Sequence, residues 1–305
     1  MNPYLYIARI DHWFKNIFVL PGSALAILFV GADSRTAITG TLLAVACACL
    51  LASANYVINE WLDAASDAHH PIKRERPAVA GRLKGRYVLM EYLAFAAAGL
   101  WLASTQSTWF LLSAAAFLLM GLIYNVKPLR AKDRPYLDVL SEAINNPLRL
   151  LLGWSAIVPD ALPPSSAVLA YWMGGAFLMA VKRYAELRFI DNPKQAADYR
   201  QSFAWYNEER LLLSAFFYAL CAAFFLGVFL IKYRIEFLLS LPLFAILFTW
   251  YLALGMRPLS PAQTPEKLFR EKSFVAFTVF LCLAIAALFA VDIPLLDILV
   301  ELPDY

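Results

Sequence analysis

The sequence predicts an all-α polytopic membrane protein, and three observations support this fold class. Of its 305 residues, 61% are hydrophobic and only 16% are charged, whereas a soluble domain is nearer half apolar and a quarter charged. Nine stretches are long and apolar enough to cross a bilayer core, which requires about 20 residues per helix. No polar segment between them is long enough to form a separate soluble domain. We therefore expect a single integral membrane domain over residues 1–305.

The nine predicted spans follow one another with short or moderate loops between them. The first four and the last three are almost purely apolar, whereas the fifth and sixth contain polar and charged residues that a lipid-facing helix excludes. The spans cover residues 16–32, 37–59, 87–104, 108–126, 138–158, 166–188, 211–231, 235–255 and 273–291.

The distribution of Lys and Arg predicts the orientation of these spans. All but four of the 26 Lys and Arg residues lie near the N-terminus, in the second, fourth, sixth and eighth loops, or at the span ends beside these loops. The exceptions are Arg149, within a span, and Arg35, Lys232 and Arg234, in loops on the other side. Short cytoplasmic loops carry an excess of Lys and Arg. We therefore expect a multi-pass protein of the plasma membrane, with a cytoplasmic N-terminus and the C-terminus on the opposite side.

The first polar cluster lies where the second span ends. Asn59, Asp63 and Asp67 recur every four residues, which places their side chains on one face of a helix. Hard oxygen ligands with room for water suit Mg²⁺, which in proteins often bridges substrate phosphates. A basic loop follows, and its cations can bind phosphate oxygens; they are Lys73, Arg74 and Arg76. A helix cap or a solvated face is the simpler alternative for a lone pair of acids.

The second cluster forms a polar stripe along the fifth predicted span. Asp138, Glu142, Asn145 and Arg149 recur at intervals of three or four. Such a stripe is too costly to face lipid, so we expect it to line the interior of the bundle. Pro147 interrupts the helical hydrogen bonds there and frees carbonyl groups, as in helices that line cavities. A purely structural network, with Glu142 paired to Arg149, is the alternative.

The third cluster, "LMAVKRYAELRFID", lies at the end of the sixth predicted span. It places two cations, a tyrosine and an acid close together, namely Lys182, Arg183, Tyr184 and Glu186. Cations at a helix end also serve as interfacial anchors. Acids suited to Mg²⁺, cations suited to phosphate and an apolar bundle together predict an enzyme that joins a water-soluble phosphorylated substrate to a lipid.

Several motifs resemble those of one family. "NEWLDAASD" (59–67) resembles the N-D-x-x-D-x-x-x-D motif of the UbiA superfamily of intramembrane prenyltransferases, and "RIDHWFKN" (9–16) resembles its R-P-x-x-W-x-K-N opening. The resemblance implies nine helices around a central cavity that opens to the cytoplasm, and Mg²⁺ as cofactor. "DAHHPIKRERPAVAG" (67–81) and "KRYAEL" (182–187) are similar to the decaprenyl-phosphate phosphoribosyltransferase branch. Glu60 departs from the motif, which has aspartate there.

That branch implies phosphoribosyl pyrophosphate (PRPP) as donor and a polyprenyl phosphate as acceptor, for synthesis of cell-envelope glycan precursors. Applied to this chain, it implies Mg²⁺ on Asn59, Asp63 and Asp67, with Asp138 and Glu142 as further catalytic residues. It implies that the remaining site residues bind substrate: Lys15, Lys127 and Arg130 near the lipid phosphate, Lys182 and Arg183 near the ribose 5-phosphate, and Lys73, Arg74, Arg76, Tyr124, Asn145, Tyr184 and Glu186 elsewhere.

Other functions remain as alternatives. "YNVKPLRAKDRPYLD" (124–138) resembles the aromatic prenyltransferase branch, in which a prenyl group moves from a prenyl diphosphate to an aromatic or other acceptor. A transporter typically shows internal repeats and polar sites at the midplane, and the sequence shows neither. Because the cations are spread along a membrane surface, we expect no nucleic-acid partner. Self-association into a homo-oligomer is compatible with the sequence, which does not determine it.

Overall fold

The computed structural model describes residues 2–263 and 265–299, and within these ranges the chain forms helices and loops with no β-strand. The predicted all-α class is confirmed. The α-helices are α1 (Pro3–Ile7), α2 (Leu20–Val30), α3 (Ser34–Asp67), α4 (Gly85–Ser104), α5 (Thr108–Asn125), α6 (Leu137–Ala143), α7 (Asn145–Ser155), α8 (Ser165–Ile190), α9 (Pro193–Tyr199), α10 (Glu208–Tyr233), α11 (Leu241–Gly255) and α12 (Lys272–Ala290). Short 3₁₀ segments join them, among them η1 (Ile10–Val19), η2 (Lys73–Glu75), η3 (Ala131–Asp133) and η4 (Gln201–Ala204).

Seven helical segments in the described part of the chain are long and apolar enough to cross a membrane. They are Pro3–Val30, Ser34–Asp67, Gly85–Ser104, Thr108–Asn125, Glu208–Tyr233, Ile235–Gly255 and Lys272–Ala290. The predicted count of nine is therefore not confirmed. The two predicted spans outside this set are those with polar residues: 138–158 is divided into α6 and α7, which meet at Ile144, and 166–188 lies within α8. The interruption precedes Pro147, as the sequence indicated.

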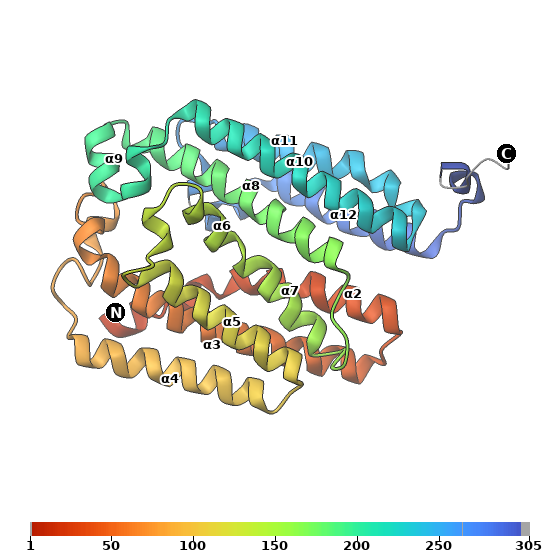
Figure 1. Ribbon diagram of the computed structural model, residues 1–305, viewed down its shortest axis with the longest axis horizontal. Helices are drawn as coiled ribbons and strands as arrows, with labels where there is room; N and C mark the ends of the chain where they lie inside the picture. The colour runs from red at the N-terminus through yellow and green to blue at the C-terminus, as the bar shows by residue number, and fades with distance from the viewer. Residues whose placement is uncertain (1, 264, 300–305) are drawn as a thin grey trace. The chain divides into compact units, whose positions relative to one another are not determined.

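The chain divides into two compact units. The N-terminal unit contains residues 1–168 together with 190–207, and the C-terminal unit contains residues 169–189 together with 208–305. Within the N-terminal unit, α4 and α5 both lie along α3 (Figure 1). The C-terminal unit is built from most of α8 and from α10, α11 and α12, with Phe177 of α8 stacked on Phe248 of α11 at a ring distance of 4.7 Å.

The core of the N-terminal unit consists of small and branched apolar side chains. Ala44, Ala48 and Leu51 of α3 are fully buried against Phe110 of α5 and Leu152 of α7. Small residues let helices approach closely in a membrane, where association depends on packing. Close backbone approach is most evident at Gly22, where a Cβ atom would lie 2.0 Å from the carbonyl oxygen of Leu150.

Polar contacts attach η1 to α3. The indole nitrogen of Trp13 donates to Ser53 Oγ at 2.9 Å, and Ser53 Oγ donates to the carbonyl oxygen of Ala8 at 2.9 Å. Asn16 accepts from Arg149 Nε at 2.9 Å, which joins η1 to α7 as well. These bonds satisfy polar groups inside an apolar bundle, where an unsatisfied group costs several kcal/mol. They fix the N-terminal segment beside the polar end of α3.

Candidate functional site

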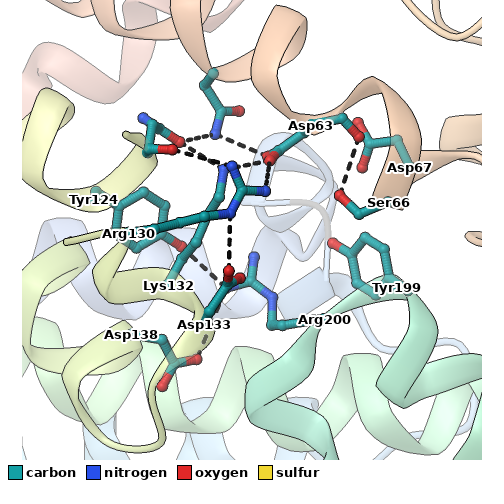
Figure 2. A network of polar contacts seen from close by, with 12 residues as sticks. Asp63, Ser66, Asp67, Tyr124, Arg130, Lys132, Asp133, Asp138, Tyr199 and Arg200 are labelled. Carbon is teal, nitrogen blue, oxygen red and sulfur yellow. Dashed lines mark hydrogen bonds and ion pairs between the residues drawn. The ribbon is translucent and has the colours of Figure 1, made fainter. Parts of the chain in front are cut away.

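Polar side chains of the N-terminal unit gather at the C-terminal end of α3. They come from α3 itself, from the loop after α5 that contains η3, and from α9 and the residue that follows it (Figure 2). At 34 residues, α3 is about 51 Å long at 1.5 Å per residue, whereas the bilayer hydrocarbon core is about 30 Å thick. The length of α3 therefore allows its polar last turns to extend beyond the hydrocarbon.

Asn59 and Asp63 form the first part of this network. Asn59 Nδ2 donates to Asp63 Oδ2 at 3.0 Å and to Asn125 Oδ1 at 2.6 Å. Asn125, at the end of α5, is held by its own donor bond to the carbonyl oxygen of Gly121 at 2.8 Å. The predicted spacing of four thus places Asn59 and Asp63 on one face, and α5 adds an amide that the sequence did not predict.

Two cations contact the same oxygen of Asp63. Arg130 Nη2 lies 3.1 Å from Asp63 Oδ1 and its Nε lies 2.9 Å from Asp133. Lys132 Nζ contacts Asp63 Oδ1 and also Asn125 Oδ1, the latter at 2.7 Å. Lys132 is 3% exposed, and this burial lowers the pKa of its ammonium to about 8, although Asp63 acts in the opposite direction. Arg130 was predicted as a lipid-phosphate residue, whereas Lys132 was missed.

The basic loop after α3 folds back onto the helix end. Arg76 Nη1 lies 2.5 Å from Asp67 Oδ2. His70 Nδ1 accepts the backbone N–H groups of Ile72 at 3.1 Å and Lys73 at 3.2 Å, which shapes the turn into η2. Lys73 Nζ contacts the Tyr199 hydroxyl and lies 4.5 Å from the centre of its ring. Burial acts against the charge of Arg76, but the neighbouring carboxylates, Asp67 first and then Glu60, together outweigh burial and raise the pKa of the guanidinium.

Asp138, predicted to be catalytic, is fully buried and accepts hydrogen bonds from the η4 region. Tyr206 Oη donates to Asp138 Oδ1 at 2.6 Å, and Ser202 Oγ donates to Oδ2 at 3.3 Å. Arg200 lies 3.8 Å from the same carboxylate. These contacts make Asp138 an anchor for the segment that carries Arg200.

Arg200 connects Asp138 to the other predicted acid of this cluster. Its Nη1 donates to Tyr124 Oη at 3.1 Å, and Tyr124 Oη donates to Glu142 Oε2 at 2.9 Å. Asn145 Nδ2 in turn donates to the carbonyl oxygen of Glu142 at 3.1 Å. The predicted residues Tyr124, Asp138 and Glu142 therefore belong to one chain of contacts, joined by Arg200, which was not predicted from the sequence.

Three further predicted residues belong to other parts of the N-terminal unit or to its pockets. In the N-terminal unit, Lys15 Nζ is 3.1 Å from His12 Nδ1 on η1. Lys127 is exposed and, with Arg130, Arg134 and Gln201, lines a pocket of about 600 Å³. Arg74 lines a second pocket of about 330 Å³, beside α9.

The third cluster belongs to the C-terminal unit. Arg183 is 1% exposed and its Nη1 lies 3.2 Å from Glu186 Oε2, so the predicted cation and acid of this cluster neutralise each other. Tyr184 Oη donates to Glu208 at 3.1 Å. Lys182 precedes them on α8, half-buried.

Glu60, the residue that departs from the family motif, makes a structural contact outside the Asn59–Asp63 network. Its carboxylate is fully buried and Oε2 lies 2.9 Å from Arg9 Nη2. Arg9 also lies over the ring of Tyr56, 5.5 Å from its centre. Glu60 thus ties the N-terminal segment to α3, at a position about 100° around the helix from Asn59.

The chemistry of this donor set suits a divalent cation. Two carboxylates and one amide supply hard oxygen ligands, and Mg²⁺ usually takes one or two protein carboxylates and completes its octahedron with water and substrate phosphates. Among residues 2–263 and 265–299, no group of three or more His, Cys, Asp and Glu side chains is arranged to hold a metal ion. Each motif carboxylate instead contacts a cation of the chain, so a metal would have to replace Lys132, Arg130 or Arg76 at these oxygens.

Comparison with known proteins identifies the family. Residues 19–281 match the UbiA prenyltransferase family. Decaprenyl-phosphate phosphoribosyltransferase of Mycolicibacterium smegmatis is 30% identical over 210 residues, which are 67% of this chain and 62% of that protein. The enzyme of the same name from Mycobacterium tuberculosis is 30% identical over 212 residues, 67% of this chain and 65% of that protein. The match therefore spans less than two thirds of either relative.

Solved structures share the fold. A UbiA homolog from Archaeoglobus fulgidus bound to GPP and Mg²⁺ aligns with a TM-score of 0.69 at 22% identity, over 95% of this chain and all of that one. The apo UbiA homolog from Aeropyrum pernix aligns with a TM-score of 0.67 at 19% identity, over 92% of this chain and 98% of that one. The family match covers most of the sequence and the fold similarity covers nearly all of it, so the chain belongs to the UbiA prenyltransferase family.

Proposed function

We propose that this protein transfers the 5-phosphoribosyl group of PRPP to a polyprenyl phosphate, with release of pyrophosphate, for cell-envelope glycan precursors. The relatives named decaprenyl-phosphate phosphoribosyltransferase, at 30% identity, support this assignment. So do the polar loops that follow α3 and α5, which contain both cations and acids. Embedding of the apolar helices in the plasma membrane would place a lipid acceptor beside a donor from the cytoplasm.

The observation that carries the proposal is the return of the basic loop to the acids of α3. Arg76 contacts the carboxylate of Asp67. Lys73 is positioned by a hydrogen bond from its backbone N–H to His70 and by the contact of its ammonium with the Tyr199 hydroxyl. Residues 67–81, which form this loop, are those that resemble the phosphoribosyltransferase branch. A guanidinium group can donate two parallel hydrogen bonds to the oxygens of one phosphate. The loop therefore supplies hydrogen-bond donors for a diphosphate beside the carboxylates of α3.

The reaction breaks the bond between C1 of the ribose and the pyrophosphate oxygen, and pyrophosphate leaves with the electron pair. An oxygen of the lipid phosphate forms the new bond to C1, with inversion. Mg²⁺, held by Asn59, Asp63 and Asp67, would neutralise charge on the leaving group. Lys73, Arg76, Arg130 and Lys132 bind phosphate oxygens and orient them. The nucleophile is already an anion at neutral pH, so the chain needs no general base.

The second candidate function is transfer of a prenyl group from a prenyl diphosphate. The loop of residues 124–138, which resembles the aromatic branch, favours it, and the solved homolog from Archaeoglobus fulgidus is bound to GPP and Mg²⁺. In that reaction the diphosphate belongs to the lipid, and the same cations bind it. The two functions differ in which substrate carries the diphosphate.

One experiment separates them. Purified protein in detergent is incubated with Mg²⁺, PRPP labelled in the ribose and decaprenyl phosphate, and the label is then measured in the organic phase. We expect label to appear there only when all three components are present. Transfer from geranyl or a longer prenyl diphosphate to an aromatic acceptor, without incorporation of ribose label, would reject the proposal in favour of the second function.

A further inference from the structure

The negative charge of the Asp63 carboxylate is already neutralised by cations of the same chain. Its Oδ1 contacts both Lys132 Nζ and Arg130 Nη2, while its Oδ2 accepts from Asn59. Lys132 is 3% exposed, and the side chain of Arg130 is 15% exposed. Two cations therefore occupy the oxygen that the family motif offers to a metal.

We propose that Lys132 is a built-in counter-ion that competes with the divalent metal for Asp63, and that it transfers to a substrate phosphate when the metal binds. This inference rests on the metal role given above to Asp63, but not on whether the donor is PRPP or a prenyl diphosphate. It assigns a task to a residue outside the metal motif of residues 59–67.

The geometry around Lys132 favours competition over simple support of the fold. Its ammonium is directed to Asp63 by a second contact, 2.7 Å from Asn125 Oδ1, and Asn125 also accepts from Asn59 at 2.6 Å. One amide therefore aligns Lys132 and Asn59 on the same carboxylate. A metal on Asp63 and the ammonium are like charges, and like charges at such separations repel strongly where water is partly excluded.

Displacement of Lys132 has a chemical consequence. A buried ammonium that loses its carboxylate is costly unless another anion replaces it. The diphosphate that accompanies the metal supplies such an anion within reach of the same loop. Metal and diphosphate should therefore bind with positive coupling, each strengthening the other by the same factor. The chain's own cation would then prevent tight metal binding until substrate arrives.

The test measures binding of Mn²⁺ alone, from the loss of the free-ion EPR signal, to purified protein in detergent. In Lys132→Met we expect the dissociation constant to fall by about tenfold, because a competing charge is removed while the length of the side chain is kept. Lys132→Arg keeps the charge and should bind as the wild type does. The matched control is Lys84→Met, which removes an exposed lysine at the start of α4. Asp63→Asn should lose binding.

A second measurement tests the transfer to phosphate. With saturating Mn²⁺, Lys132→Met should bind inorganic pyrophosphate about tenfold more weakly than the wild type, since a charge-assisted bond is lost. Mn²⁺ binding in Lys132→Met that is unchanged or weaker would overturn the competition, and unchanged pyrophosphate affinity would overturn the transfer.

Arg130→Met provides an independent variant if Lys132→Met does not fold, because it removes the other cation from Asp63 Oδ1. We expect it to tighten Mn²⁺ binding as well, and the absence of any change would count against competition by the chain's cations. Neither measurement depends on turnover. A protein that shows the Mn²⁺ effect but transfers no ribose from PRPP would retain this inference and lose the proposed function.

Discussion

Helix α3 is held in two different ways along its length. In its middle, Ala44, Ala48 and Leu51 are fully buried against apolar side chains of α4, α5 and α7. At its C-terminal end, Asp63 and Asp67 are held by Arg130, Lys132 and Arg76, all from loops. The same helix therefore joins a region stabilised by packing to a region held by ion pairs.

This difference between the middle and the end of α3 predicts that the middle determines stability and the end determines activity. Packing inside a membrane bundle depends on how closely the buried side chains fill the space between helices. Removal of a buried methyl group therefore leaves a cavity and destabilises the fold. An ion pair between the end of α3 and a loop contributes less to stability, because the attraction of the two charges is offset by the cost of removing them from water. Substitutions in the middle of α3 should therefore unfold the protein, and substitutions at its end should inactivate it.

The largest effect is expected for Asp63→Asn. We expect this change to abolish turnover, because it removes the carboxylate common to the metal motif and to Lys132. Folding and membrane insertion should be preserved, since asparagine keeps an oxygen for Lys132 and Arg130 and leaves the apolar contacts of α3 intact. The measurements are ribose transfer and thermal unfolding in detergent. Full activity in this variant would remove the metal assignment.

The opposite result is expected for Leu51→Ala in the middle of the same helix. Leu51 is fully buried and contacts the backbone region of Gly99, where a Cβ would lie 2.6 Å from Leu51 Cδ2. Truncation to alanine should lower the free energy of unfolding by about 2–5 kcal/mol. The folded fraction should keep its turnover number. A variant of normal stability but low activity would contradict the division of α3 into two regions.

Arg200→Gln should have an intermediate effect at the polar end. Loss of its charge-assisted contacts to Tyr124 and Asp138 should lower kcat/KM about 10- to 100-fold, the equivalent of about 1.5–3 kcal/mol. Asp138→Asn should lower it by a similar factor through the same arginine, and the double variant should be little worse than either alone. Additive losses in this double-mutant cycle would show that Asp138 acts separately.

The sequence predicted the part of this site whose residues lie close together in the chain. The spacing of Asn59, Asp63 and Asp67 lies within one helix, so periodicity alone placed them on one face. The apolar character of the spans and the interruption near Pro147 also followed from local patterns, while the orientation of the spans stays a prediction. The UbiA resemblance then supplied the cofactor class and the substrates as expectations.

The other part of the site depends on loop geometry that periodicity does not encode. Asn125, Lys132 and Arg200 lie far from Asp63 in the chain, and helical periodicity does not connect them to it. Asn125 and Lys132 belong to the 124–138 stretch that resembles the aromatic branch, which is the signal that could have selected them. Arg183 and Glu186 were selected for their close spacing, and that spacing is what lets them neutralise each other one helical turn apart. The binding role expected for Arg183 and Glu186 stays a prediction beside this ion pair.

The smallest expected effect is a dependence on pH that arises from Lys132. Burial lowers the pKa of its ammonium to about 8 in the folded protein, against an ordinary value of 10.5. The folded state therefore releases this proton before the unfolded state does, so this group makes stability rise with pH between about 8 and 10.5. Phosphate binding changes in the opposite direction, because the ammonium loses its charge above pH 8.

Activity should therefore decline above pH 8 while thermal stability does not decline with it. In Lys132→Arg, whose guanidinium stays charged, the alkaline limb of kcat/KM should move to higher pH. In Lys132→Met, the rise in stability between pH 8 and 10.5 should disappear. Profiles of kcat/KM and of the unfolding temperature over pH 6–10.5 measure both. If the alkaline limb of kcat/KM is the same in the wild type and in Lys132→Arg, the limb arises from another titrating group. The polar end of α3 would then owe none of its pH dependence to Lys132.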